Sequence, residues 1–68
     1  MDTNVFKKIW GKLVPQERMS LLSHCYSLAS IETKSYEATL SWDKLMPTTQ
    51  NDLFKVDWQK VLSKDLRA

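Results

Sequence analysis

The feature of this sequence that most constrains its fold is the scarcity of residues that interrupt helices and form turns. One glycine, Gly11, and two prolines, Pro15 and Pro47, occur in 68 residues. A meander of β-hairpins needs frequent tight turns, and the chain has no Asn-Gly or Asp-Gly pair to supply one. The sequence therefore predicts an all-α fold with few interruptions.

The spacing of apolar residues predicts a small three-helix bundle in a single domain, with helices at about residues 3–13, 15–42 and 49–66. Pro15 suits the first position of the second helix, because its missing N–H would have no partner there in any case. Pro47 is expected to end that region, since the residue before a proline is pushed out of helical geometry. The bundle is thus expected to have one long central helix.

Two positions leave the helix boundaries open. A break near Ser30–Thr33 would divide the central helix in two. Asp57 could cap a short separate helix, because an aspartate side chain accepts hydrogen bonds from the first amides of a helix. We expect the last helix to be continuous, and a further division would make the fold a four-helix bundle.

The apolar stripes of the three helices predict one shared core. The stripe of the central helix spans nearly half of the cylinder in its first part, so the other two helices are expected to pack against it. The predicted core residues are Phe6, Ile9, Leu13, Met19, Leu22, Cys25, Tyr26, Ala29, Tyr36, Leu40, Leu53, Phe54, Trp58, Val61 and Leu62.

A chain of this length needs additional stabilisation, since it buries only about 60% of its unfolded surface. Cys25 is the only cysteine, so a disulfide within the chain is excluded. His24 is the only histidine, and one cysteine with one histidine cannot complete a zinc site of four ligands. Aromatic packing and self-association remain, and we expect a homodimer or a complex with another protein.

The residue patterns that would indicate catalysis are missing from the sequence. His24 and Cys25 are neighbours on a predicted helix, so their side chains point about 100° apart and do not face each other. Glu32 and Glu37 are five residues apart and do not share a helical face. A single glycine cannot form a glycine-rich phosphate loop. We expect no enzyme, no cofactor and no metal site.

The charge distribution and hydropathy bear on location and on binding to membranes. The formal net charge is +2 and the charges are interspersed, which does not indicate a strongly basic nucleic-acid surface. We find no membrane span and no apolar stretch typical of a signal peptide, and the single free cysteine fits a reducing compartment. We therefore expect a cytoplasmic protein. Lys7, Lys8 and Lys12 face away from the apolar stripe, but they are too few for a polybasic membrane anchor.

Four serines at helical spacing form a narrow band on the predicted central helix: Ser20, Ser23, Ser27 and Ser30. We interpret the band as a solvent-facing surface. The alternative is that these small side chains allow another helix to approach closely, a motif best known from membranes.

Three tryptophans point to protein binding as the function. Trp10, Trp42 and Trp58 lie on three different segments, and tryptophan, tyrosine and methionine are enriched in the cores of protein interfaces. Trp42 lies off the line of Tyr36 and Leu40, so it either folds back over the bundle or faces outward. We expect at least one tryptophan, first of all Trp42, to be partly exposed, and the alternative is that all three close one core. The residues predicted to contact a protein partner are Trp42, Trp10, Met46 and Leu45.

A small DNA-binding regulator is the second hypothesis. The segment SLASIETKSYEATLSW, residues 27–42, could form a helix-turn-helix with Thr33 at the position where glycine is common. Its second helix would present Lys34 between Glu32 and Glu37, and carboxylates facing DNA would repel it. The sequence therefore favours a non-catalytic adaptor or regulator that acts by protein–protein contact.

Overall fold

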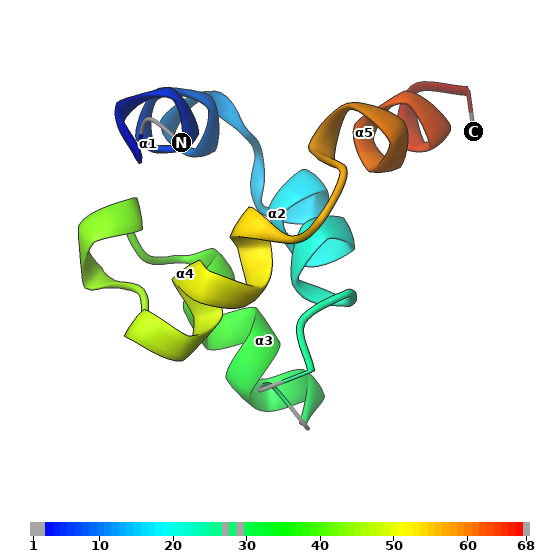
Figure 1. Ribbon diagram of the computed structural model, residues 1–68. Coiled ribbons are helices and arrows are strands. Elements are labelled where there is room, and N and C mark those ends of the chain that lie inside the picture. Colours follow the sequence, from blue (N-terminus) through cyan, green and yellow to red (C-terminus); the bar gives the residue numbers. More distant parts are fainter. Residues whose placement is uncertain (1–2, 27, 29, 68) are drawn as a thin grey trace.

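The chain folds into short helices, and the computed structural model describes residues 3–26, 28 and 30–67. The expectation of an all-α fold is confirmed, and the described ranges contain no strand. Their elements are α1 (Thr3–Lys12), α2 (Pro15–Leu22), α3 (Ile31–Ala38), the 3₁₀-helix η1 (Trp42–Lys44), α4 (Pro47–Phe54) and α5 (Trp58–Arg67). In Figure 1, α1 and α5 lie at one end of the molecule, α3 lies at the other, and α2 runs between them. None of the helices in these ranges has the length and apolar character needed to cross a bilayer.

The first helix and the start of the second form where the sequence predicts them. α1 ends at Lys12, one residue before the predicted end, and α2 begins at Pro15. Glu17, in the first turn of α2, accepts a hydrogen bond from the backbone N–H of Val14 at 3.0 Å. This carboxylate satisfies an amide at the helix start, where the helix dipole also favours a negative charge.

The predicted long central helix is wrong, because the helix ends at Leu22 and does not resume until Ile31. The break near Ser30 is the correct alternative. Ser30 adopts an extended backbone conformation and its hydroxyl accepts a hydrogen bond from the N–H of Thr33 at 3.1 Å. A serine at this position stabilises a new helix start by about 1 kcal/mol. The connection between the two helices buries Cys25 and Leu28 in the core.

The predicted last helix is also divided, so the expectation of a continuous helix over 49–66 is wrong. α4 starts at Pro47, two residues earlier than predicted, and a three-residue connection separates it from α5. Asp57 accepts a hydrogen bond from the backbone N–H of Lys60 at 3.2 Å, which is the capping role considered as the alternative. The indole N–H of Trp58 donates to the carbonyl of Leu53 at 2.8 Å and so links the two helices.

Five aromatic rings form the centre of the core. They come from four different elements, and their centroids lie between 4.9 Å and 6.3 Å apart in seven pairs. The rings belong to Phe6, Trp10, Trp42, Phe54 and Trp58. Each such pair contributes about 0.5–1.5 kcal/mol beyond the area it buries. The cluster therefore supplies, within one chain, the dense aromatic packing that a small domain needs.

The core predicted from the sequence is right for most of its members and wrong at three described positions. Buried as predicted are Leu22, Cys25, Leu53 and Trp58, and partly buried against the core are Phe6, Leu13, Met19, Leu40, Phe54, Val61 and Leu62. Three predicted members are exposed: Ile9, Tyr26 and Tyr36. Ala29 lies outside the described residues. Core residues that the prediction omitted are Trp10, Leu21, Leu28, Ala38, Trp42 and Leu45.

Arg18 joins the ends of two helices through its guanidinium group. Its Nε and Nη2 donate to the carbonyl of Trp10 at 3.1 Å and 2.9 Å, and its Nη1 donates to the carbonyl of Ala38 at 2.9 Å. The same group lies 5.0 Å from the centroid of the Trp10 ring, within the range of a cation–π contact. Carbonyls at the C-terminal ends of α1 and α3 lack partners within their own helices, and the negative pole of the helix dipole attracts a cation there.

Candidate functional site

Three of the four residues predicted to contact a partner lie inside the protein. Trp42 is only 5% exposed, so the expectation that it is partly exposed is wrong. Its indole covers the protein's own core, which is the alternative that the sequence left open. Trp10 and Leu45 are buried as well, and Met46 alone is exposed. Contact between these four residues and a partner stays a prediction, but three of their side chains face inward.

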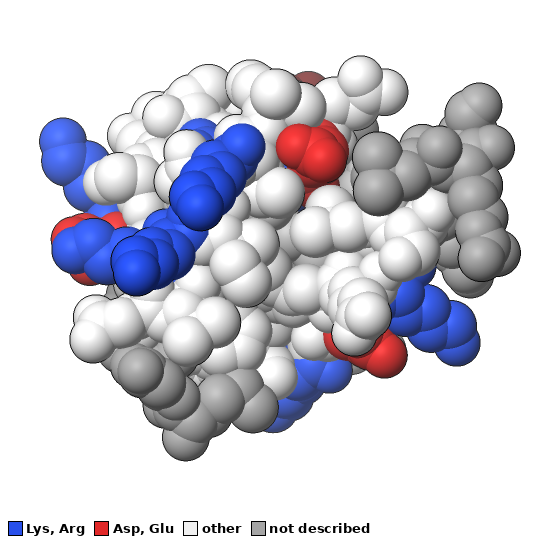
Figure 2. Space-filling model, turned by 90° about the horizontal axis from the view of Figure 1, so that it is seen from above, with Lys and Arg blue, Asp and Glu red and all other residues white. Residues whose placement is uncertain are grey.

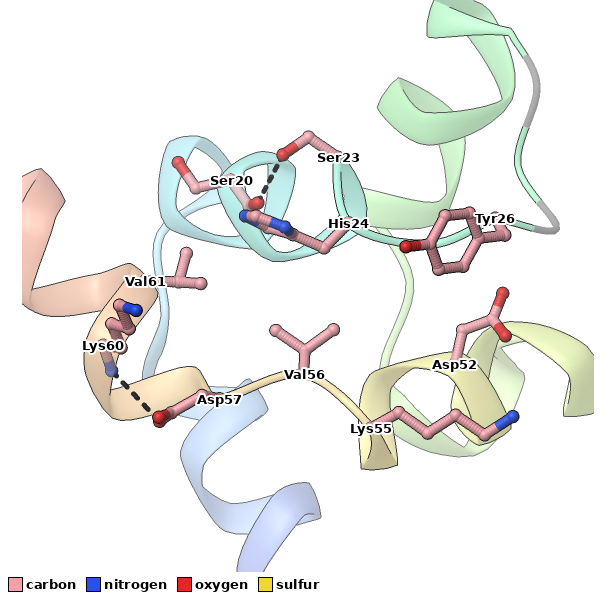
Figure 3. Close-up of a pocket in the computed structure, with 10 residues that line it drawn as sticks. All are labelled: Ser20, Ser23, His24, Tyr26, Asp52, Lys55, Val56, Asp57, Lys60 and Val61. Carbon is pink, nitrogen blue, oxygen red and sulfur yellow. Dashed lines mark hydrogen bonds between the residues drawn. The ribbon is translucent and has the colours of Figure 1, made fainter.

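A groove lies between α2 and the α4–α5 region. It has a volume of about 600 Å³ and is lined by Ser20, Ser23, His24, Tyr26, Asp52, Lys55, Val56, Asp57, Lys60 and Val61. Figure 3 shows residues of α2 and the segment after it along one wall, and residues from Asp52 to Val61 along the other. We call this concavity the α2 groove.

Apolar side chains form the floor of the α2 groove, and a tyrosine stands at its edge. Val56 points into the space in Figure 3, and Val56 and Val61 are both half-buried. Tyr26 is 97% exposed, and its hydroxyl is directed toward the groove in Figure 3. A large aromatic side chain that gains almost no burial within its own chain is a strong candidate for an interface, where tyrosine is enriched.

The charges on the groove walls are mixed. Asp52 and Lys55 come from the end of α4 and its following turn, and Asp57 and Lys60 come from the start of α5. The two carboxylates and the two ammonium groups cancel in formal charge, so the α2 groove does not favour a highly charged ligand. Within the described part of the chain, no group of three or more His, Cys, Asp or Glu residues is placed to hold a metal ion.

The serine band predicted from the sequence contributes two residues to the groove. The hydroxyl of Ser20 donates to the carbonyl of Gln16 at 3.3 Å, and that of Ser23 donates to the carbonyl of Ser20 at 2.6 Å. Both hydroxyls therefore donate their hydrogen bonds to nearby backbone carbonyls. Their small side chains make this wall of the groove shallow. Ser30 caps α3 instead of joining this wall, and Ser27 lies outside the described residues.

His24 and Cys25 lie on different sides of the chain. His24 lines the α2 groove, whereas Cys25 is a buried free cysteine. Burial raises the pKa of the Cys25 thiol from 9.0 to about 11; Asp52 and Glu37 add to the rise, and Lys34 opposes it. Because the thiolate is the reactive form, the side chain is a poor nucleophile at neutral pH and packs as a small apolar group.

Glu37 is a buried carboxylate of α3. It is 2% exposed, and its Oε1 accepts hydrogen bonds from the hydroxyl of Thr49 at 2.9 Å and from the backbone N–H of Met46 at 3.4 Å. Glu37 therefore caps the start of α4 from another helix, because the side chain of Met46 cannot. Its Oε2 has no hydrogen-bond partner within the described residues. No local pattern in the sequence indicates this role, since the partners are nine and twelve residues away.

The described residues of segment 27–42 do not form the helix-turn-helix considered under the second hypothesis. Thr33 lies inside α3 and not at a turn, and the connection from α2 to α3 spans residues 23–30. A helix-turn-helix joins its helices by three or four residues. A connection of that length occurs instead between α4 and α5, at residues 55–57.

No protein-family model matches the chain, and no curated protein or solved structure is found to be similar to it. The α2 groove and the residues around it are therefore the basis for assigning a function.

Proposed function

We propose that this protein is a small non-catalytic adaptor or regulator that acts by binding another protein, and that the α2 groove is its contact surface. The observation that carries the proposal is the fully exposed Tyr26 at the edge of a groove with an apolar floor. Burial of one tyrosine and of the two valines of the floor would remove apolar surface from water at about 25 cal/mol per Å². Such a centre, surrounded by mixed charges, has the composition of a protein interface.

A protein segment suits the α2 groove better than a small ligand does. Pockets for small molecules bury about 70–90% of the ligand surface. The edges of this groove are open, because His24, Tyr26, Lys55 and Lys60 are all exposed. A ligand of small size would remain largely in water there, whereas a helix or an extended peptide could contact both walls along their length.

Self-association through this surface is part of the proposal. The groove could receive a second copy of the chain or a different protein. The internal aromatic cluster means that a dimer is not required to complete the core, so oligomerisation serves binding and not folding.

The test compares two exposed tyrosines. Tyr26 borders the α2 groove, and Tyr36 is 65% exposed on α3, outside the groove. Tagged wild-type protein, Tyr26→Ala and Tyr36→Ala are used to recover bound proteins from a native lysate, and sedimentation measures self-association. We expect Tyr26→Ala to lose the bound protein or the dimer and Tyr36→Ala to keep it. Equal recovery by the three proteins, or no stoichiometric partner and no dimer for the wild type, would refute the proposal.

DNA binding is the second candidate function, and the short connection between α4 and α5 favours it. In a helix-turn-helix the second helix would present the start of α5, where Gln59, Lys60 and Ser63 are exposed. Asp57 lies at the same end and would face the phosphates, which weakens the case. Affinity for duplex DNA that falls steeply as salt rises would support it, while binding through Tyr26 and the valine floor is expected to be nearly independent of salt.

A further inference from the structure

Among the helices of this protein, α1 carries the largest net positive charge. The helix contains three lysines and no acidic residue. The chain has ten Lys and Arg residues against eight Asp and Glu residues, so seven cations and eight anions lie outside α1. The net charge of +2 therefore consists of +3 on α1 and −1 on the remainder. Figure 2 shows lysine and arginine side chains gathered over the part of the surface where α1 lies in Figure 1.

Two of the three lysines share a face of α1 with two exposed aliphatic residues. At 100° per residue, Val5, Lys8, Ile9 and Lys12 fall within an arc of about 100°. The core-facing side of the helix, with Trp10 at its centre, lies next to this arc. Val5 is 51% exposed and Ile9 is 37% exposed, and both lysines are exposed. We call these four residues the α1 face.

The lysines of the α1 face differ from Lys7 in their ion pairing. Lys7, on another side of the helix, forms an ion pair with Asp43 of η1, with 2.7 Å between Nζ and Oδ2. Lys8 and Lys12 form no ion pair within the described residues. They stand at i and i+4, where two like charges destabilise a helix by about 0.2–0.5 kcal/mol. Residues at i and i+4 have Cβ atoms about 5–6 Å apart. This spacing is shorter than the Debye length of about 8 Å at physiological salt, so salt screens the two lysines only partly from each other.

We propose that the α1 face binds an acidic amphipathic helix of a partner protein. Carboxylates of the partner would pair with Lys8 and Lys12, and its apolar side chains would cover Val5 and Ile9. This interaction surface is separate from the α2 groove and does not depend on it. A protein with both would hold two partners of different chemistry.

A protein helix fits the α1 face better than a lipid surface or a nucleic acid does. Membrane-surface helices insert large aromatic residues, but the two aromatic residues of α1, Phe6 and Trp10, pack into the protein's own core. Phosphates would pair with the lysines but would leave Val5 and Ile9 in water, because backbone contacts to nucleic acids are electrostatic. An acidic partner with apolar side chains uses both components of the face.

The test uses a fluorescent synthetic helical peptide with glutamates on one side and leucines beside them. Its affinity for the full-length protein is measured by fluorescence anisotropy, and a control peptide carries glutamine in place of every glutamate. We expect the acidic peptide to bind and the glutamine peptide to bind at least about tenfold more weakly. Failure of the acidic peptide to bind more tightly than the glutamine peptide would overturn the proposal.

Variants of the protein then separate the two components of the α1 face. Lys8→Gln with Lys12→Gln should weaken binding of the acidic peptide about five- to tenfold, and Val5→Ser with Ile9→Ser should weaken it by a similar factor. Lys34→Gln with Lys55→Gln removes two lysines from other elements and should change the affinity by less than about twofold. Circular dichroism confirms that each variant is folded. Equal weakening by all lysine pairs would show attraction without a defined face and would overturn the proposal.

The same variants distinguish the α1 face from other binding classes and from the α2 groove. Duplex DNA and vesicles containing anionic phosphatidylserine serve as alternative probes. The proposal would be overturned if either probe bound more tightly than the acidic peptide and if Val5→Ser with Ile9→Ser left that binding unchanged. The lysines would then serve phosphate recognition. Tyr26→Ala should leave affinity for the acidic peptide unchanged, so failure of the groove hypothesis and failure of the α1 hypothesis give different results.

Discussion

The two sides of α2 differ in how deeply they are buried. The closed side packs against the core, and the open side borders the α2 groove. On one side, Leu21 and Leu22 are completely buried against a core whose centre is five aromatic rings. On the other side, Ser20 and Ser23 border an open groove of about 600 Å³. This small chain therefore concentrates its stabilising contacts on one side of α2 and leaves the other side available for binding. Substitutions on the closed side should change stability, and substitutions on the open side should change binding alone.

Removal of one indole from the closed side should give the largest effect. Trp42→Ala deletes a buried side chain that contacts four other aromatic rings, and such substitutions cost about 3–5 kcal/mol. We expect cooperative folding to be lost or the urea midpoint to fall sharply in denaturation followed by circular dichroism. The control is Tyr36→Ala, an exposed aromatic residue that should cost less than about 0.5 kcal/mol. A similar loss in both variants would contradict the distinction between buried and exposed aromatic residues.

Removal of the buried carboxylate should give the next largest effect. Glu37→Ala leaves the Thr49 hydroxyl and the Met46 N–H without an acceptor, and each unsatisfied buried donor costs about 1–3 kcal/mol. Glu37→Gln keeps an acceptor oxygen at Oε1, so the free energy of unfolding should fall by much less. Chemical denaturation of the two variants measures the difference, with Glu32→Ala on the exposed side of α3 as the control. Equal losses in the Ala and Gln variants would show that the negative charge, and not the acceptor, stabilises α4.

The buried thiol predicts a loss of stability at high pH. Burial raises the pKa of Cys25 in the folded protein to about 11, against an ordinary value of 9.0. Between these values the unfolded chain has lost the thiol proton and the folded chain retains it, so the free energy of unfolding falls as pH rises. Below pH 9 the thiol contributes no such slope. Cys25→Ala should flatten the dependence between pH 9 and 11 relative to wild type, measured by thermal unfolding at each pH. Parallel curves for the two proteins would contradict the raised pKa.

The smallest stability effect should come from the open side. Tyr26→Ala removes a side chain that is 97% exposed, so the free energy of unfolding should change by less than about 0.5 kcal/mol. The same variant is expected to lose binding at the α2 groove. Denaturation and binding are measured on one preparation. A loss of stability greater than about 1 kcal/mol would show that Tyr26 packs against its own chain, and the contrast between the two sides of α2 would then fail.

The errors at Tyr26, Tyr36 and Trp42 have one physical cause. A rotation of 100° per residue predicts the direction of a side chain only while the helix continues, because that direction is counted from the preceding turns. α2 ends at Leu22, so the extrapolation to Tyr26 and Tyr36 lost its rotational reference, and both side chains face solvent. The same loss of phase left the direction of Trp42 undetermined. Leu13, Met19 and Leu22, which precede the break, pack as predicted.

Local chemistry in the sequence determined the helical class, the extent of α1 and the starts of the helices at Pro15 and near Pro47. These features depend on the scarcity of glycine and proline and on proline geometry, which act within a few residues. The capping roles of Ser30 and Asp57 were visible as alternatives for the same reason. The residues of the α2 groove could be predicted only in part. The sequence indicated Ser20 and Ser23 as a band of small residues, but it placed Tyr26 in the core.

Which charged and aromatic side chains are buried depends on the tertiary packing of the helices. Arg18 reaches carbonyls 8 and 20 residues away, and Glu37 accepts hydrogen bonds from positions 9 and 12 residues away. No periodicity encodes such contacts, because they depend on where helix ends meet after packing. Trp42 faces inward for a similar reason: the rings that surround it come from α1, α4 and α5, which are brought together only when the chain has folded.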